Sequence, residues 1–120
     1  MIKEDLKERL QQFTGSTKYY IHAISDYSMN ITEGARYLAD TAGAYWLLDV
    51  ILSYQWNSKY NQQVFQAWKL ERKDENSFLV TCTDGNENKF GEQYIPYSDF
   101  PLDSISLWLV NNVCMLPNEY

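Results

Sequence analysis

The side chains that most often carry out enzyme chemistry are few in this sequence and lie far apart. There is one histidine, His22, and there are two cysteines, Cys82 and Cys114. A structural zinc site takes about four nitrogen or sulfur ligands at close spacing, which these three residues do not provide. A cysteine–histidine pair for nucleophilic catalysis is conceivable, but nothing local activates either thiol, and both lie in apolar segments typical of buried cysteine. We therefore expect no metal site, no cofactor and no catalytic residues.

Asp49 is the one charged residue in the apolar segment 44–56. A buried carboxylate can have a raised pKa and act as an acid or a base. It can also pair with Arg36 or with a tyrosine hydroxyl, and this structural role is the expected one because buried charges are usually paired. The alternative is a small-molecule or enzyme site between a sheet and this helix, using Asp49, His22 and tyrosine hydroxyls.

The segment 84–88, Asp-Gly-Asn-Glu-Asn, resembles the start of a calcium-binding loop. An EF-hand loop needs glycine at its sixth position and glutamate at its twelfth, and these positions hold Lys89 and Ile95. The segment is therefore predicted to be a hairpin turn. The sequence also contains no nucleotide-binding glycine loop and no serine-hydrolase or zinc-protease motif.

The net charge of −6 lies entirely in the C-terminal part of the chain. Residues 74–120 contain eight acids against one base, Lys89, whereas residues 1–73 are close to neutral. Such a field repels nucleic-acid phosphate and anionic lipid, so we expect no direct binding to nucleic acid or membrane. It attracts a basic protein surface, and simple solubilisation by the acids is the alternative. The acids expected to contact a partner are Asp84, Glu87, Glu92, Asp99 and Asp103.

The elements that must position these residues follow from the hydrophobic periodicity. A helical period predicts helices at about 2–13, 32–42 and 44–56. A period of two predicts strands at about 64–72, 77–83, 89–97 and 105–116. Helices followed by strands with hairpin-length connections favour an α+β fold, with N-terminal helices packed on a C-terminal antiparallel β-meander of about four strands. The whole chain, 1–120, is expected to be one domain.

Several local features are less regular. The segment 18–29 shows no clean alternation, which leaves a short strand and an ordered loop both open, and 57–63 is expected to be a polar linker. Asn30 with Glu33 resembles a capping box, and Thr32 is a competing N-cap. The consecutive asparagines at 111–112 predict a bulge or turn within the last strand.

Composition supports an ordinary folded domain. The chain has 120 residues, of which 45% are hydrophobic and 22% charged, enough for one core. No run of about 18 apolar residues is present, so we expect no membrane span. The N-terminus has no apolar stretch after its charges, so we expect no secretory signal and a cytoplasmic protein with reduced cysteines.

Three motifs point to a family. They are AGAYWLLD at 42–49, DFPL at 99–102 and LPNEY at the C-terminus. Together they resemble a family of small bacterial and phage or mobile-element proteins classed as a domain of unknown function, over nearly the whole chain. The resemblance implies an intracellular protein often carried on mobile DNA, and it implies no activity and no catalytic residues.

The expected function is a non-enzymatic, acidic protein-binding module. Aromatic residues make up 16% of the chain, and those not used in the core can anchor a protein partner. A concrete version is a mobile-element inhibitor of a host defence nuclease, of the anti-CRISPR or anti-restriction type, that covers a basic surface. The alternatives are a small-molecule-binding protein or enzyme with a site near Asp49, and a self-associating structural protein that uses the apolar helix at 44–56. A homo-oligomer is compatible with each of these.

Overall fold

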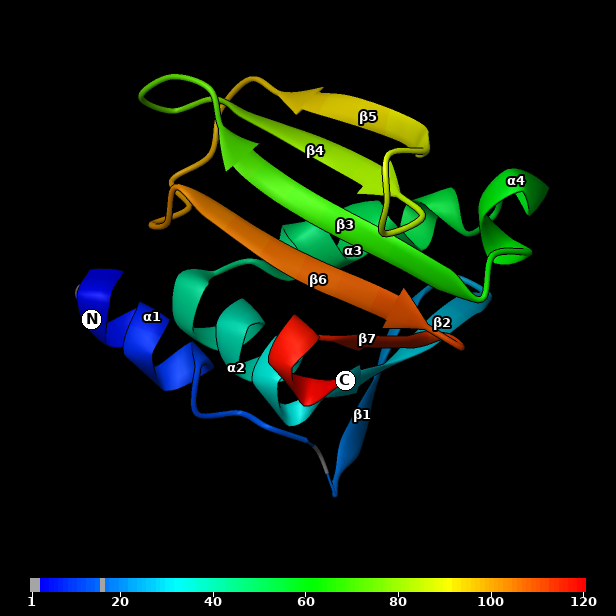
Figure 1. The fold of residues 1–120 in the computed structure, drawn as a ribbon, viewed down its shortest axis with the longest axis horizontal. Helices are drawn as coiled ribbons and strands as arrows, with labels where there is room; N and C mark the ends of the chain where they lie inside the picture. The colour runs from blue at the N-terminus through cyan, green and yellow to red at the C-terminus, as the bar shows by residue number, and fades with distance from the viewer. Residues whose placement is uncertain (1–2, 16) are drawn as a thin grey trace.

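The computed structural model describes residues 3–15 and 17–120 of the chain. In this part, four α-helices pack on a seven-stranded sheet (Figure 1). The helices are α1 (Lys3–Leu10), α2 (Glu33–Ala42), α3 (Tyr45–Tyr54) and α4 (Ser58–Asn61). The strands are β1 (Tyr19–Ile24), β2 (Tyr27–Thr32), β3 (Phe65–Arg72), β4 (Phe78–Thr83), β5 (Lys89–Ile95), β6 (Ser104–Val110) and β7 (Val113–Met115). A 3-10 turn, η1 (Pro117–Glu119), follows β7.

The sheet confirms the α+β class but corrects the predicted four-stranded meander. Its strand order is β1-β2-β7-β6-β3-β4-β5. Only β3, β4 and β5 follow one another as a meander, because the chain then returns to place β6 on the other side of β3. Strand β7 lies between β6 and β2, antiparallel to the first and parallel to the second. The N-terminal hairpin thereby becomes part of the same sheet.

The ambiguous segment 18–29 forms most of the hairpin of β1 and β2. A two-residue turn joins the strands, with Ser25 at a positive φ of 55°. Alternation is hard to see because Tyr19 and Ile21 are apolar yet 55% and 75% exposed, so both faces of β1 carry apolar side chains. The ordinary signal of a half-buried strand, polar outside and apolar inside, is therefore missing here.

Two other predictions are refined by the structure. The expected strand at 105–116 is divided into β6 and β7 by a turn in which Asn111 and Asn112 have φ values of 50° and 65°. This is the left-handed pair that asparagine tolerates in tight hairpins, and it confirms the predicted turn. The expected linker at 57–63 contains the short helix α4, whose first turn is capped by Asn57 through its side-chain oxygen and the Lys59 amide at 2.9 Å.

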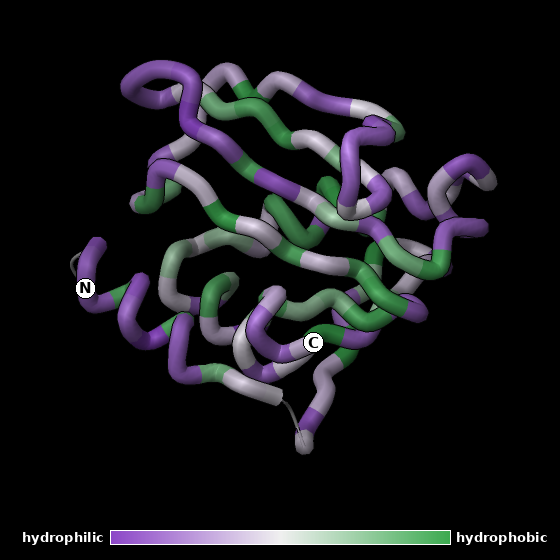
Figure 2. Tube along the Cα trace, in the orientation of Figure 1, coloured by the Kyte–Doolittle hydropathy of each residue, from purple (hydrophilic) through white to green (hydrophobic). Residues whose placement is uncertain are grey.

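The core lies between one layer of helices and one face of the sheet, and Figure 1 shows α3 behind the central strands. Strand β3 directs Gln66, Trp68 and Leu70 toward the helices, and all three are buried. Figure 2 shows the hydrophobic segments along α3 and the central strands and the hydrophilic ones mainly in connections and α1. Helix α3, expected to be apolar nearly all round, buries one side, made of Leu47, Leu48, Ile51 and Leu52.

Helix α1 is shorter than the predicted helix at 2–13, and α2 lies close to the predicted bounds of 32–42. Helix α1 buries Leu6 and Leu10 of the predicted apolar stripe, while Ile2, its first member, lies outside the described residues. Thr32, rather than Asn30, is the N-cap of α2 and accepts a hydrogen bond from the Ala35 amide at 3.2 Å. Gly43 ends this helix at a φ of 62°, as predicted from its position.

A buried carboxylate joins the start of α2 to η1. Glu119 is 9% exposed, and its Oε1 accepts hydrogen bonds from the Thr32 hydroxyl at 2.6 Å and from the Leu116 amide at 3.0 Å. Its Oε2 accepts a hydrogen bond from the Gly34 amide at 3.0 Å. An anionic group at a helix N-terminus is stabilised by the free amides and the helix dipole. The segment after β7 is therefore fixed against α2.

Candidate functional site

The five acids predicted to bind a partner do not gather in one place. Asp84 and Glu87 lie in the turn between β4 and β5, whereas Asp99 and Asp103 lie in the connection after β5. Strand β5 has 7 residues. At about 3.3 Å per residue, the two groups are therefore roughly 20 Å apart. Glu92 lies between them on the strand itself.

Three of these acids have partners within the chain. Asp103 pairs with Lys3 and with Arg72, each at 3.1 Å, and Glu92 pairs with Lys89 at 3.1 Å. Asp84 accepts hydrogen bonds from the Asn86 amide at 2.9 Å and from the Asn88 side chain at 2.7 Å. The hydrogen bonds from Asn88 and then Asn86 lower the pKa of Asp84. These contacts give Asp84 and Asp103 a structural role in the connections at the two ends of β5, whereas the Glu92 pair lies on the strand itself.

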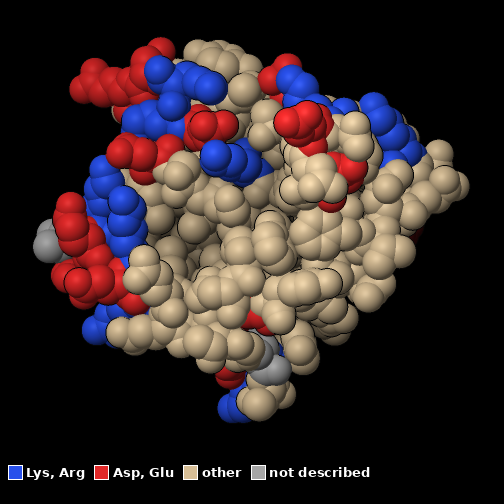
Figure 3. Space-filling model, viewed as in Figure 1, with Lys and Arg blue, Asp and Glu red and all other residues tan. Residues whose placement is uncertain are grey.

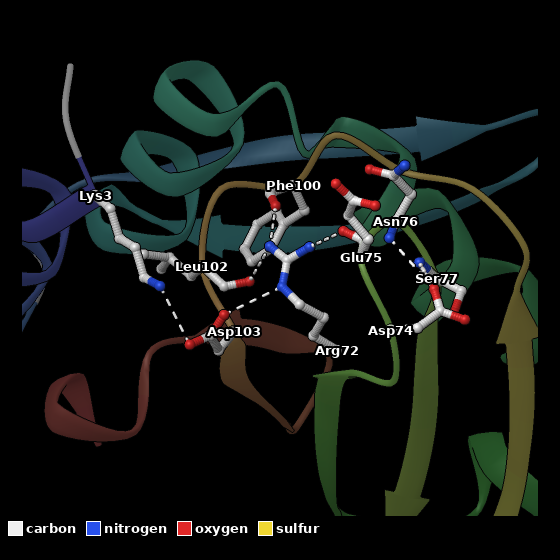
Figure 4. A network of polar contacts seen from close by, with 9 residues as sticks. All are labelled: Lys3, Arg72, Asp74, Glu75, Asn76, Ser77, Phe100, Leu102 and Asp103. Atoms are coloured by element: carbon white, nitrogen blue, oxygen red, sulfur yellow. Dashed lines mark hydrogen bonds and ion pairs between the residues drawn. The ribbon is translucent and has the colours of Figure 1, made fainter.

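Arg72 organises the loop in which Asp103 lies (Figure 4). Its guanidinium donates hydrogen bonds to the carbonyl oxygens of Glu75 at 2.6 Å, Phe100 at 2.8 Å and Leu102 at 3.2 Å. The hydrogen bond from Lys3, followed by that from Arg72, lowers the pKa of Asp103. Arg72 thus links the turn after β3 to the connection that leads into β6.

Asp49 pairs with His22, the residue grouped with it in the alternative small-molecule site, and not with Arg36 or a tyrosine hydroxyl. Its side chain is 52% exposed, so it is not buried, and its Oδ1 lies 2.7 Å from His22 Nε2. Arg36 instead lies 3.6 Å from Asp40 and stacks on the ring of Tyr20, with 4.1 Å from the guanidinium carbon to the ring centroid. Helix α3 is amphipathic at this point, and Asp49 lies on its outer side.

An open cavity of about 320 Å³ lies beside this His22–Asp49 pair. The residues that line it are Tyr20, Ile21, His22, Ile31, Arg36 and Tyr45. The Tyr45 hydroxyl donates a hydrogen bond to Asp40, which is the main reason that the pKa of Tyr45 is raised. The cavity therefore combines aromatic walls with an imidazole, a guanidinium and two nearby carboxylates.

The hydroxyl groups among the residues that line this cavity belong to Tyr20 and Tyr45. A histidine oriented by a carboxylate can act as a base when a hydroxyl or thiol lies next to it, but no serine, threonine or cysteine lines the cavity. The thiols of Cys82 and Cys114 are buried elsewhere in the core, and burial raises the pKa of each to about 12. At neutral pH such thiols are protonated and are poor nucleophiles.

A cluster of aromatic side chains lies at the outer face of the sheet, and the sequence analysis did not predict it. Phe65, Trp108 and Tyr120 contact one another, with ring centroids 5.1 Å apart for Phe65 and Trp108 and 5.4 Å apart for Trp108 and Tyr120. Tyr120 is 74% exposed. Strand register places Val110, Val113 and Met115 on the same side. We call these six residues the aromatic face.

None of the six side chains of the aromatic face is charged. Figure 3 shows a broad area mostly without Lys, Arg, Asp or Glu over the region where Figure 1 places the end of β6 and β7, with a small area of Asp or Glu atoms near the C-terminus. The charged side chains seen from this side gather along its margins, including the region of α1. The sequence of β6 contains a signal for this face. Ser104, Ser106 and Trp108 alternate with buried or half-buried residues, so Trp108 is a large aromatic side chain on the side of the strand where the serines lie.

Among residues 3–15 and 17–120, no group of three or more His, Cys, Asp and Glu side chains is arranged to hold a metal ion. None of the helices in this part is both long enough and apolar enough to cross a membrane.

The fold and its surface define a small α+β domain in which one helical layer covers one face of a mixed sheet. The chain belongs to DUF6876, a family of unknown function whose family model matches residues 4–120. This confirms the resemblance to a family of unknown function that the motifs indicated. No match was found among curated proteins or among solved structures.

Proposed function

We propose that this protein acts by binding another protein through the aromatic face of its sheet. The observation that supports this proposal is the contact of Phe65, Trp108 and Tyr120 on an outer surface with no charge among its members. Tryptophan and tyrosine are enriched among the residues that dominate binding energy at protein interfaces. Their side chains have only two rotatable χ angles, so they lose little conformational entropy when a partner binds.

The proposed partner is a different protein with basic residues around an apolar contact. Two copies of this chain each carry a net charge of −6 and repel one another, whereas a basic partner is attracted. The acids at the two ends of β5 then contribute to the rate of encounter more than to the contact itself. A host defence nuclease has a surface of this charge, and the phage or mobile-element character suggested by the motifs favours such a partner.

The experiment compares two tyrosines of similar exposure. Tyr120 on the aromatic face and Tyr97 in the connection after β5 are 74% and 70% exposed. Tagged wild-type protein, Tyr120→Ala, Trp108→Lys and Tyr97→Ala are used to recover partners from nuclease-treated lysate of the source cells. The affinity of each variant for the recovered protein is then measured at low and high salt.

We expect the wild type and Tyr97→Ala to bind alike, and Tyr120→Ala and Trp108→Lys to bind at least tenfold more weakly. Thermal unfolding of each variant separates loss of binding from loss of folding. Equal affinity of all four proteins for the recovered partner would count against the proposal, and so would an affinity that is the same at low and high salt.

A further inference from the structure

The two outer strands of the sheet differ in how their free edges are protected. Strand β5 carries Lys89 and Glu92, is paired through an irregular register, and is followed by Pro96. In addition, the Tyr60 hydroxyl donates a hydrogen bond to the Phe90 carbonyl at 3.1 Å. Charges, bulges and proline are the usual devices that prevent an edge strand from pairing with another chain.

Strand β1 has none of these devices within its own bounds, and the one charged residue next to it is Lys18, directly before its first residue. Its six residues, YYIHAI, include no Lys, Arg, Asp, Glu or proline, and they pair with β2 in unbroken register. Tyr19 and Ile21 are 55% and 75% exposed on the outer side of the sheet. An uncharged, regular edge with exposed apolar side chains is a template for an additional strand.

The backbone groups that face this edge follow from the pairing. The Asn30 amide donates a hydrogen bond to the Asn112 carbonyl at 3.0 Å, so the Asn30 backbone points away from β1. In an antiparallel pair, directly opposed residues either exchange both hydrogen bonds or none, and Ile21 is opposite Asn30. The N–H and C=O of Ile21 therefore point to the free edge. By alternation those of Tyr19 and Ala23 do so too.

The cavity beside His22 lies where side chains of an added strand would arrive. Tyr20 and His22 point to the helix side of β1 and line the cavity together with Ile21, Arg36 and Tyr45. Alternate residues of a strand project to opposite faces, so every second side chain of an added strand would lie on the helix side, where the one next to His22 would meet this cavity. Strand-adding partners gain affinity from main-chain hydrogen bonds and specificity from pockets for alternate side chains.

The charges around the cavity favour a basic side chain. The side chains of Asp40 and Asp49 are 53% and 52% exposed. The Arg36 guanidinium, which lines the cavity, stacks on the Tyr20 ring and pairs with Asp40, so these two opposite charges compensate each other. Asp49 beside His22 is then the carboxylate that attracts a cation. Tyr45, 39% exposed, offers an aromatic wall on which a second guanidinium could stack.

We infer that β1 is a docking edge for an extended segment of the partner protein, which adds as a further strand and places an Arg or Lys side chain beside His22 and Asp49. The inference rests on the proposed function because the added strand is a segment of the proposed partner protein. It concerns a different surface from the aromatic face, so the two can fail separately. A second copy of the chain is disfavoured as the occupant by the net charge of −6 on each molecule.

The test uses capped heptapeptides of sequence Thr-Val-Thr-X-Thr-Val-Thr, in which X is Arg, Gln or Glu, titrated into the protein and followed by NMR. We expect the Arg peptide to bind at least threefold more tightly than the Gln peptide and at least tenfold more tightly than the Glu peptide. Bound Arg peptide should slow hydrogen exchange at the amides of Tyr19, Ile21 and Ala23 at least tenfold. The amides of Tyr20 and His22, already directed at β2, should change little.

A pair of variants tests the backbone contribution. Ile21→Pro removes an N–H that faces the free edge and takes no part in the β1–β2 ladder, so an edge strand can tolerate it. We expect it to abolish peptide binding, whereas Ile21→Thr, which keeps the N–H and loses only part of the exposed apolar side chain, should weaken binding by less than about threefold. Asp49→Asn should reduce the preference for Arg over Gln. Thermal unfolding shows whether Ile21→Pro is folded. If it is not folded, hydrogen exchange at the three edge amides of the wild type with bound Arg peptide is the test of backbone pairing.

Four results would overturn the inference: no binding of the Arg peptide at millimolar concentration, binding without slower exchange at the three edge amides, equal binding by a folded Ile21→Pro variant, or no preference among the peptides. Slow exchange at the same amides that increases with protein concentration in the absence of peptide would assign the edge to a second copy instead.

Discussion

Removing the Glu119 carboxylate is expected to be among the most destabilising single changes in this domain. The carboxylate accepts hydrogen bonds from the Thr32 hydroxyl, the Leu116 amide and the Gly34 amide at 2.6–3.0 Å. Glu119→Ala removes all three acceptor contacts and leaves two backbone amides at the start of α2 and η1 without this partner. It also removes a negative charge from the N-terminus of α2.

The magnitude follows from the contacts. A hydrogen bond to a charged group contributes about 1.5–3 kcal/mol, and such contributions are not additive within one network. Glu119 is 9% exposed, so water can reach part of the vacated space and recover some of the loss. We therefore expect a net loss of about 3 kcal/mol. This is a large fraction of the roughly 5–15 kcal/mol by which domains are stable.

Urea unfolding followed by tryptophan fluorescence measures this loss directly. The midpoint should fall with little change in the slope of free energy against urea, because the surface exposed on unfolding stays the same. Gly34→Ala should act similarly, because the added Cβ would lie 2.5 Å from Glu119 Oε1. Glu87→Ala, at an exposed turn position, is the matched control and should cost less than about 0.5 kcal/mol. A loss below about 1 kcal/mol for Glu119→Ala would refute the reasoning.

Three further outcomes are expected. Gly91→Ala should lower the free energy of unfolding by about 1–3 kcal/mol, because the added Cβ would collide with the Tyr60 hydroxyl. The same change should cost clearly less in a Tyr60→Phe background, and a double-mutant cycle by urea unfolding measures the difference. The pKa of Asp103 is lowered from its ordinary value of 3.8, so the stability that it contributes is present above that pH and is lost as the pH falls below it. Asp103→Asn should therefore flatten the fall of the melting temperature in acid, and an unchanged profile would contradict this. Cys82 and Cys114, with pKa values raised to about 12, should resist alkylation at pH 8 until the protein unfolds, which mass spectrometry can follow.

The sequence predicted the elements whose two sides differ in polarity. Helix α2 and strands β3 and β4 have clean periodicity and were placed within a residue or two of their observed bounds. Strand β1 was not identified, because exposed Tyr19 and Ile21 remove the contrast between its faces. Helix α4 lies in a polar segment where only the cap at Asn57 marks its start.

The candidate site was harder to predict than the fold. Counting acids identified a charged half of the chain, but the structure distributes those acids over two ends of β5 and pairs Asp103 with Lys3 and Arg72. The aromatic face has a local signal, since Trp108 alternates with serines in β6. The contact of Thr32 with Glu119 joins residues separated by 87 positions, and no local pattern could reveal it.

The position of β7 also has a consequence for how the molecule folds. The β1–β2 hairpin and the β3–β4–β5 meander are pairings between neighbours along the chain, which form readily. Strand β7 connects these two units by pairing Asn30 with Val113, a contact that closes most of the chain into a loop. We expect this parallel pairing to form after the folding transition state. Substitutions such as Cys114→Ala at the β2–β7 boundary should then accelerate unfolding far more than they slow folding, so that this boundary sets the kinetic lifetime of the native sheet.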